Sequence, residues 1–142
     1  MAANILIIET NNFLCEHLFW HMDKKGWRIF KSRQQKDVKQ ILKIHKIDVV
    51  LLDLSDLKKE GLTLLKMIRN MRPSIQVITI NSGEQISLSI EGMKLGAFDD
   101  FLMPLNLDSL ICRIREAYQK KKGEKKIKGV KDERNETIAG GR

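Results

Sequence analysis

The sequence has few of the residues that mark a cross-linked, metal-bound or membrane protein. Only two of its 142 residues are cysteines, Cys15 and Cys112, and no C-x-x-C spacing joins them. This pattern supports neither a disulfide framework nor a zinc site, and it is typical of a reducing compartment. The longest apolar run is far shorter than a membrane span, and the chain enters an apolar strand with no leader before it. We therefore expect a cytoplasmic protein without a membrane segment.

Motifs for nucleotide binding and DNA recognition are also absent. The chain has neither a G-x-G-x-x-G nor a Walker-type loop, which argues against nucleotide binding. It has no helix-turn-helix, zinc-finger or winged pattern, so we expect no sequence-specific binding of nucleic acid. His17 and His21 lie four residues apart, but no third ligand accompanies them. We interpret them as surface or boundary residues and not as metal ligands.

Basic residues are concentrated at the C-terminus. The chain has a formal net charge of +8, and residues 119–142 contain nine Lys or Arg against four acids. This segment has almost no large apolar residues and cannot bury a core of its own. We therefore expect one domain over residues 1–118 and a disordered basic tail over residues 119–142. Such a tail is either a solvated segment or linker, or a non-specific contact to nucleic acid.

The rest of the chain alternates between apolar and amphipathic segments. Short apolar runs occupy residues 5–8, 27–30, 49–52, 77–80 and 101–102. Hydrophobic residues at helical spacing occupy residues 14–22, 38–45, 64–71, 86–95 and 107–117. This alternation predicts a parallel β-sheet with helices on both faces. The chain is long enough to form one domain with a proper core.

A charged residue ends the apolar run at 49–52. The carboxyl ends of strands in an open parallel sheet line the crevice where ligands bind, so Asp53 occupies a position where chemistry is expected. The alternative is that Asp53 is the first loop residue and caps the turn that follows. This segment by itself leaves both interpretations open.

Residues 4–118 resemble a response-regulator receiver domain of two-component signalling. Asp53 falls where the family has its phosphoacceptor aspartate, and Gly61 follows it by eight residues, as the family's glycine does. Steps of 28 residues from Asp53 to Asn81, and of 22 from Asn81 to Met103, match the family's intervals from aspartate to hydroxyl residue to lysine. The segment GAFDDFLMP at 96–104 is similar to the family motif GA-x-D-[YF]-L-x-KP.

This resemblance implies a fold and a function. The fold is a doubly wound, flavodoxin-like α/β domain with five parallel strands in the order 2-1-3-4-5 and helices on both faces. Asp53 would accept a phosphoryl group from a histidine kinase or phosphotransfer protein in a phosphorelay, and the domain would act on a downstream protein partner. A homodimer through the last helices is a further implication. The chain would not be an enzyme, apart from catalysing its own phosphorylation and dephosphorylation.

The family's metal site is altered in this sequence. Relatives hold Mg²⁺ with an acidic pair, the phosphoacceptor and a backbone carbonyl two residues later. Here the pair is Glu9 and Thr10, so Glu9, Asp53 and the carbonyl of Ser55 remain as ligands. Magnesium depends on carboxylate charge, and we expect its binding to be weak or absent because of Thr10.

Three other family positions bear on switching. Met103 stands at the lysine position and cannot supply the ammonium that pairs with phosphoryl oxygens. Asn81 replaces Ser or Thr, although its amide can still donate a hydrogen bond to an anion. Phe101, or Asp100 in another alignment, falls at the aromatic switch position.

Two hypotheses follow for the altered site. In the first, Asp53 is phosphorylated and draws Asn81 toward it, which shifts the helix near 84–94 and the face that it forms with the last strand and helix. In the second, the chain is a phosphorylation-independent pseudo-receiver that works as a protein-interaction module. The retained Asp53 and Glu9 favour the first hypothesis. The loss of a metal carboxylate and of the lysine charge favours the second.

Overall fold

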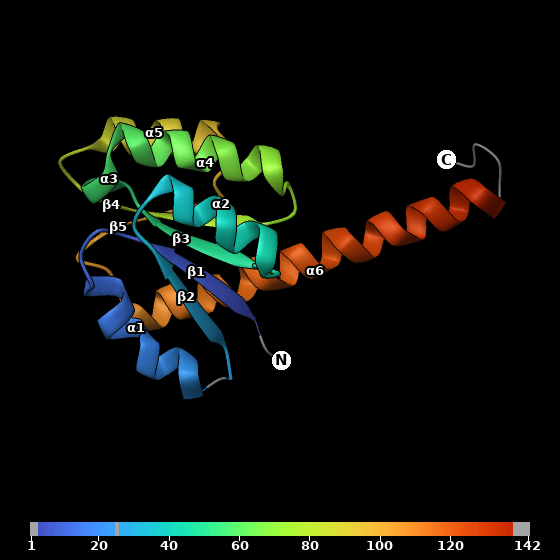
Figure 1. Cartoon of the computed structure of the whole chain (residues 1–142), viewed down its shortest axis with the longest axis horizontal. Helices are drawn as coiled ribbons and strands as arrows, with labels where there is room; N and C mark the ends of the chain where they lie inside the picture. The colour runs from blue at the N-terminus through green and yellow to red at the C-terminus, as the bar shows by residue number, and fades with distance from the viewer. Residues whose placement is uncertain (1–2, 25, 138–142) are drawn as a thin grey trace.

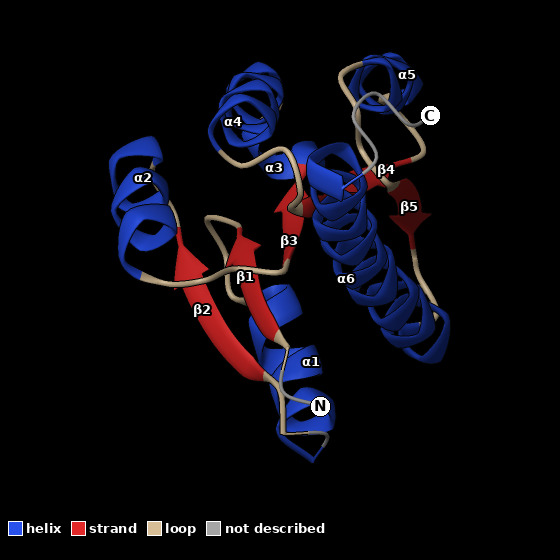
Figure 2. Cartoon of the chain, turned by 90° about the vertical axis from the view of Figure 1, so that its right-hand side faces the viewer, coloured by secondary structure: helices blue, strands red, loops and turns tan. Residues whose placement is uncertain are grey.

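A five-stranded parallel sheet lies between two layers of helices (Figure 2). This computed structural model describes residues 3–24 and 26–137, with the backbone alone for residues 23–24 and 124–137. The strands are β1 (Asn4–Ile8), β2 (Arg28–Ser32), β3 (Val49–Asp53), β4 (Gln76–Ser82) and β5 (Asp99–Met103). Their order is β2-β1-β3-β4-β5 and all neighbours are parallel, which confirms the predicted fold class.

The helices divide between the two faces of the sheet (Figure 2). On one face lie α1 (Phe13–Lys24) and α6 (Leu107–Thr137). On the other lie α2 (Gln35–Ile44), α4 (Lys59–Met71) and α5 (Ile86–Lys94). The short helix α3 (Leu54–Leu57) follows β3 directly. The sequence pattern did not predict α3, because four residues are too few to show a helical repeat.

Alternate side chains of the central strands serve two hydrophobic cores. In β1, Ile5 and Ile7 pack in the core under α1 and α6, whereas Leu6 and Ile8 pack in the core under α2 and α4. Successive side chains of a strand point to opposite faces, so one strand supplies both cores. All of β3 is buried, as expected for a central parallel strand covered on both sides. Asp53, its last residue, therefore lies at the carboxyl edge of the sheet.

Gly61 packs α4 closely against α3. A Cβ atom at this position would lie 2.6 Å from Cδ2 of Leu54 and 3.3 Å from Cβ of Leu57. Both leucines are buried, so a larger residue would push the two helices apart. The glycine at this family position thus has a local packing reason in this chain.

The last helix is longer than the sequence predicts. The helical spacing of hydrophobic residues ends at residue 117, but α6 runs to Thr137 and extends beyond the sheet (Figure 1). Lys121 is buried within α6, and its Nζ donates a hydrogen bond to Asp48 Oδ1 at 2.6 Å. Disorder of the tail stays a prediction, and its last residues, 138–142, lie outside the described part. No helix of the described part is long and apolar enough to cross a membrane.

Candidate functional site

Asp53 is held at the junction of β3 and α3. Its carboxylate caps α3, because Oδ1 accepts a hydrogen bond from the backbone N–H of Asp56 at 3.3 Å. Oδ1 also accepts a hydrogen bond from the hydroxyl of Ser55 at 2.6 Å. The capping role and the edge position that the sequence left as alternatives are thus both present. Because both hydrogen bonds go to Oδ1, they fix the carboxylate and leave Oδ2 outside this pair of contacts.

Burial of Asp53 disfavours the charged form of its carboxyl group. The residue is only 7% exposed, and its burial raises the pKa of the carboxyl above the ordinary aspartate value. The Ser55 hydroxyl and the Asp56 N–H oppose this rise in pKa, and the negative charge of Asp56 adds to it. A buried carboxylate at a strand end whose pKa is raised in this way is a candidate for a functional group.

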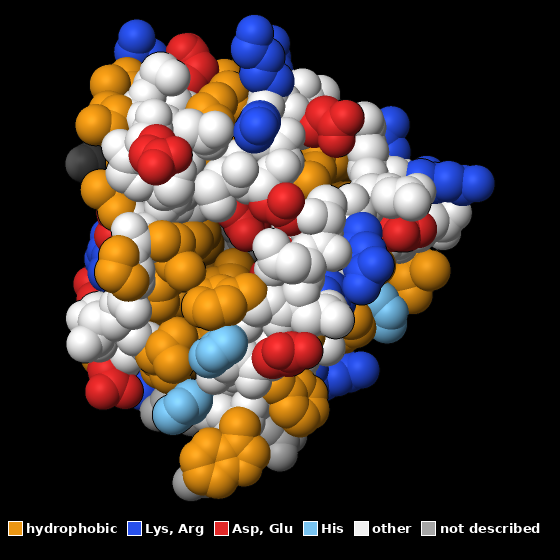
Figure 3. All heavy atoms as spheres, turned by 90° about the vertical axis from the view of Figure 1, so that its left-hand side faces the viewer, with side chains coloured by type: hydrophobic (Ala, Val, Ile, Leu, Met, Phe, Trp, Pro, Cys, Tyr) orange, Lys and Arg blue, Asp and Glu red, His pale blue; other side chains and the backbone are white. Residues whose placement is uncertain are grey.

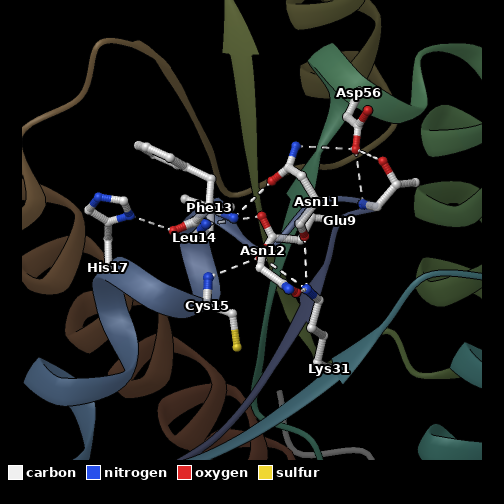
Figure 4. A network of polar contacts seen from close by, with 10 residues as sticks. Glu9, Asn11, Asn12, Phe13, Leu14, Cys15, His17, Lys31 and Asp56 are labelled. Atoms are coloured by element: carbon white, nitrogen blue, oxygen red, sulfur yellow. Dashed lines mark hydrogen bonds and ion pairs between the residues drawn. The ribbon is translucent and has the colours of Figure 1, made fainter.

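Both carboxylate oxygens of Glu9 contact neighbours from its own chain (Figure 4). It has no exposed surface, and its two oxygens accept hydrogen bonds from the backbone N–H groups of Leu14 at 3.0 Å and Cys15 at 2.9 Å. These N–H groups belong to the first turn of α1, where a negative charge is favourable. Lys31 adds an ion pair, with its Nζ 3.7 Å from Oε2 of Glu9.

Thr10 contacts the carboxylate of Asp56, a residue of α3. Its backbone N–H donates to Asp56 Oδ2 at 2.9 Å, and its hydroxyl donates to the same oxygen. The side-chain amide of Asn11 approaches this oxygen at 3.5 Å. The hydrogen bond from the Thr10 hydroxyl is the main reason that the pKa of the Asp56 carboxyl lies below the ordinary aspartate value. The loop between β1 and α1 is thereby tied to α3.

Asn81 is buried and its amide is turned toward α5. Its Nδ2 donates to the carbonyl of Gln85 at 3.0 Å and to the hydroxyl of Ser89 at 2.9 Å. Its Oδ1 accepts from the backbone N–H of Ser82 at 3.0 Å. Both amide hydrogens that were expected to serve an anion therefore have partners in this state. The role of Asn81 as a switch residue stays a prediction, but its physical link to α5 is direct.

The residues near the end of β5 are mostly apolar. Phe101 and Met103 are partly buried and pack against the core under α1 and α6. Asp100, the other residue considered for the aromatic switch position, accepts a hydrogen bond from the Thr79 hydroxyl at 2.5 Å. Met103 therefore contributes packing where the family pattern has a positive charge.

The carboxyl edge combines acidic and hydrophobic surface. Figure 3 looks onto this edge and shows acidic side chains near its middle, with hydrophobic and histidine side chains beside them. On α1, Phe13 and Trp20 are exposed, and the Phe13 ring lies 4.2 Å from the ring of His17. His17 also contacts the Phe13 carbonyl through Nδ1 at 2.7 Å. Both α1 histidines thus lie among aromatic residues of the surface, in agreement with a boundary role.

A parallel sheet of this order with helices on both faces defines a doubly wound α/β domain, and the comparison with known proteins identifies the family. The family model described as response regulator receiver domain matches residues 5–115. The chain therefore belongs to the response regulator receiver family of two-component systems.

Curated relatives are longer proteins. The transcriptional regulatory protein ZraR of Klebsiella oxytoca is 25% identical over 115 residues, which cover 81% of this chain and 26% of that protein. The transcriptional regulatory protein DltR of Streptococcus agalactiae is 27% identical over 111 residues, which cover 78% of this chain and 50% of that protein. This chain thus spans between a quarter and a half of the length of these two relatives.

Solved structures agree on the fold. A CheY-like response regulator receiver domain protein from Methanospirillum hungatei matches with a TM-score of 0.77 at 18% identity, over 87% of this chain and 99% of that one. A response regulator from Thermotoga maritima matches with a TM-score of 0.75 at 23% identity, over 84% of this chain and 99% of that one.

Receiver domains bind Mg²⁺ at their phosphorylation site, and such an ion needs oxygen ligands in near-octahedral geometry. Both oxygens of Glu9 hold α1 and face Lys31, and the Thr10 hydroxyl faces Asp56. Of the predicted ligands, Asp53 and the carbonyl of Ser55 remain. No group of three or more His, Cys, Asp or Glu in the described part could hold a metal ion. As arranged, the side chains of Glu9 and Thr10 do not fit a magnesium site, and Asp53 is the carboxylate of the predicted set that lies outside these contacts.

Sequence reasoning missed two charged residues of this edge, Asp56 and Lys31. Asp56 lies three residues after Asp53, and such a spacing is common at the start of a helix. Lys31 falls just past the run at 27–30, because β2 runs two residues further, to Ser32. In the structure, β2 extends to Ser32 and Lys31 lies opposite Ile7 near the end of β1. The position of Lys31 therefore depends on the length and register of this edge strand, which the apolar run did not show.

Proposed function

We propose that this chain is a receiver in a phosphorelay and that Asp53 accepts a phosphoryl group from a histidine kinase or phosphotransfer protein. The observation that carries the proposal is the geometry of its carboxylate: Ser55 and Asp56 fix Oδ1 at the edge of the sheet, and Oδ2 is the oxygen that remains for the phosphorus atom. Burial of a carboxylate costs free energy, and the capping of α3 uses only its Oδ1.

In the proposed reaction, Oδ2 attacks the phosphorus of the donor. A bond forms between Oδ2 and phosphorus, and the bond from phosphorus to the donor nitrogen or oxygen breaks, with its electron pair leaving on the donor. Such transfers proceed through a loose transition state, so the site contributes positioning more than covalent help. The two hydrogen bonds to Oδ1 supply this positioning by restricting rotation of the carboxylate.

The proposed output runs through Asn81. The amide of Asn81 holds the Gln85 carbonyl and the Ser89 hydroxyl, so it connects the end of β4 to the start of α5. A new dianion on Asp53 would compete for the amide hydrogens and would loosen this connection. The first turn of α5 would then move, which is the two-state element that a switch requires.

A hydrophobic surface on α5 and β5 would read this movement. Its residues are exposed by between 46% and 58%: Ile86, Ile90, Met93 and Leu102. A patch of large exposed apolar side chains indicates an interaction site. We propose that a downstream protein docks on this surface, formed by α5, β5 and the start of α6, or that a second copy of the chain does so.

An intact-mass measurement tests phosphorylation. The protein is incubated with Mg²⁺ and acetyl phosphate, beside the Asp53→Asn variant. We expect a mass increase of one phosphoryl group in the unaltered protein and none in the variant. If no donor concentration or donor type increases the mass of the unaltered protein, the phosphoacceptor proposal is wrong.

A second candidate function is that of a phosphorylation-independent interaction module. The observation that favours it is that Glu9, Thr10 and Asn81 all have partners within the chain. Under this alternative, Asp53→Asn leaves partner binding by the α5 and β5 surface unchanged, while Ile90→Asp weakens it. Under the first proposal, acetyl phosphate changes partner binding and Asp53→Asn abolishes that change.

A further inference from the structure

A lysine ammonium lies beside the acidic residue that the sequence assigned to a metal. We propose that Lys31 is the resident cation of this site, and that it neutralises Glu9 in the place where receiver domains use a divalent metal ion. The proposal concerns the cation alone, so it does not depend on whether Asp53 is phosphorylated.

The Lys31 ammonium is surrounded by oxygen atoms of the β1–α1 loop (Figure 4). Its Nζ donates a hydrogen bond to the carbonyl of Asn11 at 2.8 Å and another to the side-chain oxygen of Asn12. The third contact is the ion pair with Glu9 Oε2 at 3.7 Å. The ammonium therefore makes two hydrogen bonds and one ion pair, all with oxygen atoms of this loop. The side chain is 21% exposed, which means that most of the stem and head is covered.

Both carboxylate oxygens of Glu9 already have partners within the chain. Each oxygen accepts a backbone N–H from the first turn of α1, at 3.0 Å from Leu14 and 2.9 Å from Cys15. Lys31 and the positive end of α1 together balance the negative charge of this fully buried side chain. A magnesium ion demands near-octahedral oxygen ligands and gives up its water reluctantly. To bind Glu9, it would have to share oxygens that already accept the α1 N–H groups, and it would lie close to the Lys31 ammonium.

The strand register fixes Lys31 in this position. β2 pairs with β1 in parallel, with Lys31 opposite Ile7 and Ser32 opposite Ile8. The pairing continues past the strand ends, because the Glu9 N–H donates to the Ser32 carbonyl at 3.2 Å. Lys31 and Glu9 are therefore delivered to the same edge by adjacent strands. Met103 on β5 stands where the family has a lysine, whereas the ammonium beside Glu9 comes from β2.

Binding of Mn²⁺, a paramagnetic substitute for Mg²⁺, tests the proposal directly. Free Mn²⁺ is counted by electron paramagnetic resonance during titration of the full chain and of Lys31→Gln, and added Mg²⁺ checks competition for the same site. We expect Lys31→Gln to bind Mn²⁺ at least about tenfold more tightly, which equals about 1.4 kcal/mol. The reason is that repulsion between the ammonium and a nearby divalent ion is removed.

Two control variants separate the local effect from a general loss of charge. Lys31→Arg keeps the positive charge and should keep the weak affinity of the unaltered protein. Lys36→Gln removes one charge from an exposed position of α2 and should also leave the affinity unchanged. Equal affinity of Lys31→Gln and the unaltered protein, with matching circular dichroism spectra, would overturn the proposal.

A further variant keeps the test decisive if Lys31→Gln does not fold. Lys31→Met removes the same charge and keeps an apolar stem of similar length, so it should raise Mn²⁺ affinity to the same extent as Lys31→Gln. Unchanged Mn²⁺ affinity in a folded Lys31→Met variant would refute the proposal. Failure of acetyl phosphate to modify Asp53, with the expected Mn²⁺ results, would overturn the phosphoacceptor proposal and leave this one standing.

Discussion

The buried ion pair between Asp48 and Lys121 provides a sharp test of how α6 is attached to the sheet. The two side chains are 9% and 7% exposed, and Lys121 Nζ lies 2.6 Å from Asp48 Oδ1. The other oxygen of Asp48 accepts a hydrogen bond from the Asn4 N–H at 2.8 Å. The Lys121→Met variant would keep the length and packing of the side chain but would remove its charge.

The expected loss of stability in Lys121→Met depends on the Asp48 carboxylate, which stays buried without its partner. Removing one partner of a buried ion pair costs about 3–5 kcal/mol, because the other charge stays buried. We expect a value near the lower limit, about 3 kcal/mol, since the Asn4 N–H remains and the pocket beside Asp48 is also lined by Lys46 and Lys122. For a chain of this size, such a loss lowers Tm by about 6–12 °C.

Chemical denaturation of four proteins checks this expectation: the unaltered chain, Lys121→Met, Asp48→Asn, and the double variant. The double variant should recover part of the loss, since neither charge is then left without its partner. Lys66→Met, on an exposed position of α4, is a matched control and should stay within about 0.5 kcal/mol of the unaltered chain. If Lys121→Met is as stable as this control, α6 is not anchored by the pair, and the predicted domain boundary at residue 118 gains support.

Three other predictions concern the site and the fold. Burial raises the pKa of Asp53, so protonation of this carboxyl stabilises the fold below the ordinary aspartate pKa, and this stabilisation is lost as pH rises through the folded pKa. Asp53→Asn should therefore raise the free energy of unfolding at neutral pH and raise it much less in acid. Urea titrations at both pH values would show this difference. Thr10→Asp with Met103→Lys should raise Mn²⁺ affinity and the rate of modification by acetyl phosphate about tenfold or more, equal to about 1.4 kcal/mol of added stabilisation, and unchanged values would contradict our account of the missing charge. Gly96→Ala should cost more than about 1 kcal/mol in thermal or urea unfolding, since φ is +102° and a Cβ would lie 3.0 Å from the Arg69 side chain, whereas Gly83→Ala has no atom within 4 Å and should be nearly neutral.

The central strands and the position of Asp53 could be predicted because they depend on hydrophobic patterning. The run at 49–52 is buried on both faces, and its pattern is therefore strong. Edge strands such as β2 and β5 are only partly buried, so their apolar runs were shorter than the strands themselves. The length of α6 was underestimated because lysine is a good helix former, and because the buried pairing of Lys121 with Asp48 is not visible in a hydrophobic repeat.

The chemistry of the site was less predictable than its location. The sequence indicated which residue types lie at the edge, but the partners of Glu9, Thr10 and Asn81 depend on side-chain rotamers and on strand register. Glu9 has no exposed surface and caps α1, an arrangement that a carboxylate before a helix allows but does not require. Which of the possible partners a side chain contacts depends on its surroundings in the folded structure, which the sequence pattern does not show.

The most direct test of the central claim identifies the modified residue. After incubation with acetyl phosphate, the protein is treated with borohydride, which reduces an aspartyl phosphate to homoserine, and its peptides are sequenced by mass spectrometry. Our account predicts homoserine at position 53 and at no other acidic residue of the edge. Homoserine at position 56, or an unaltered aspartate at position 53 in protein that has gained a phosphoryl group, would contradict it.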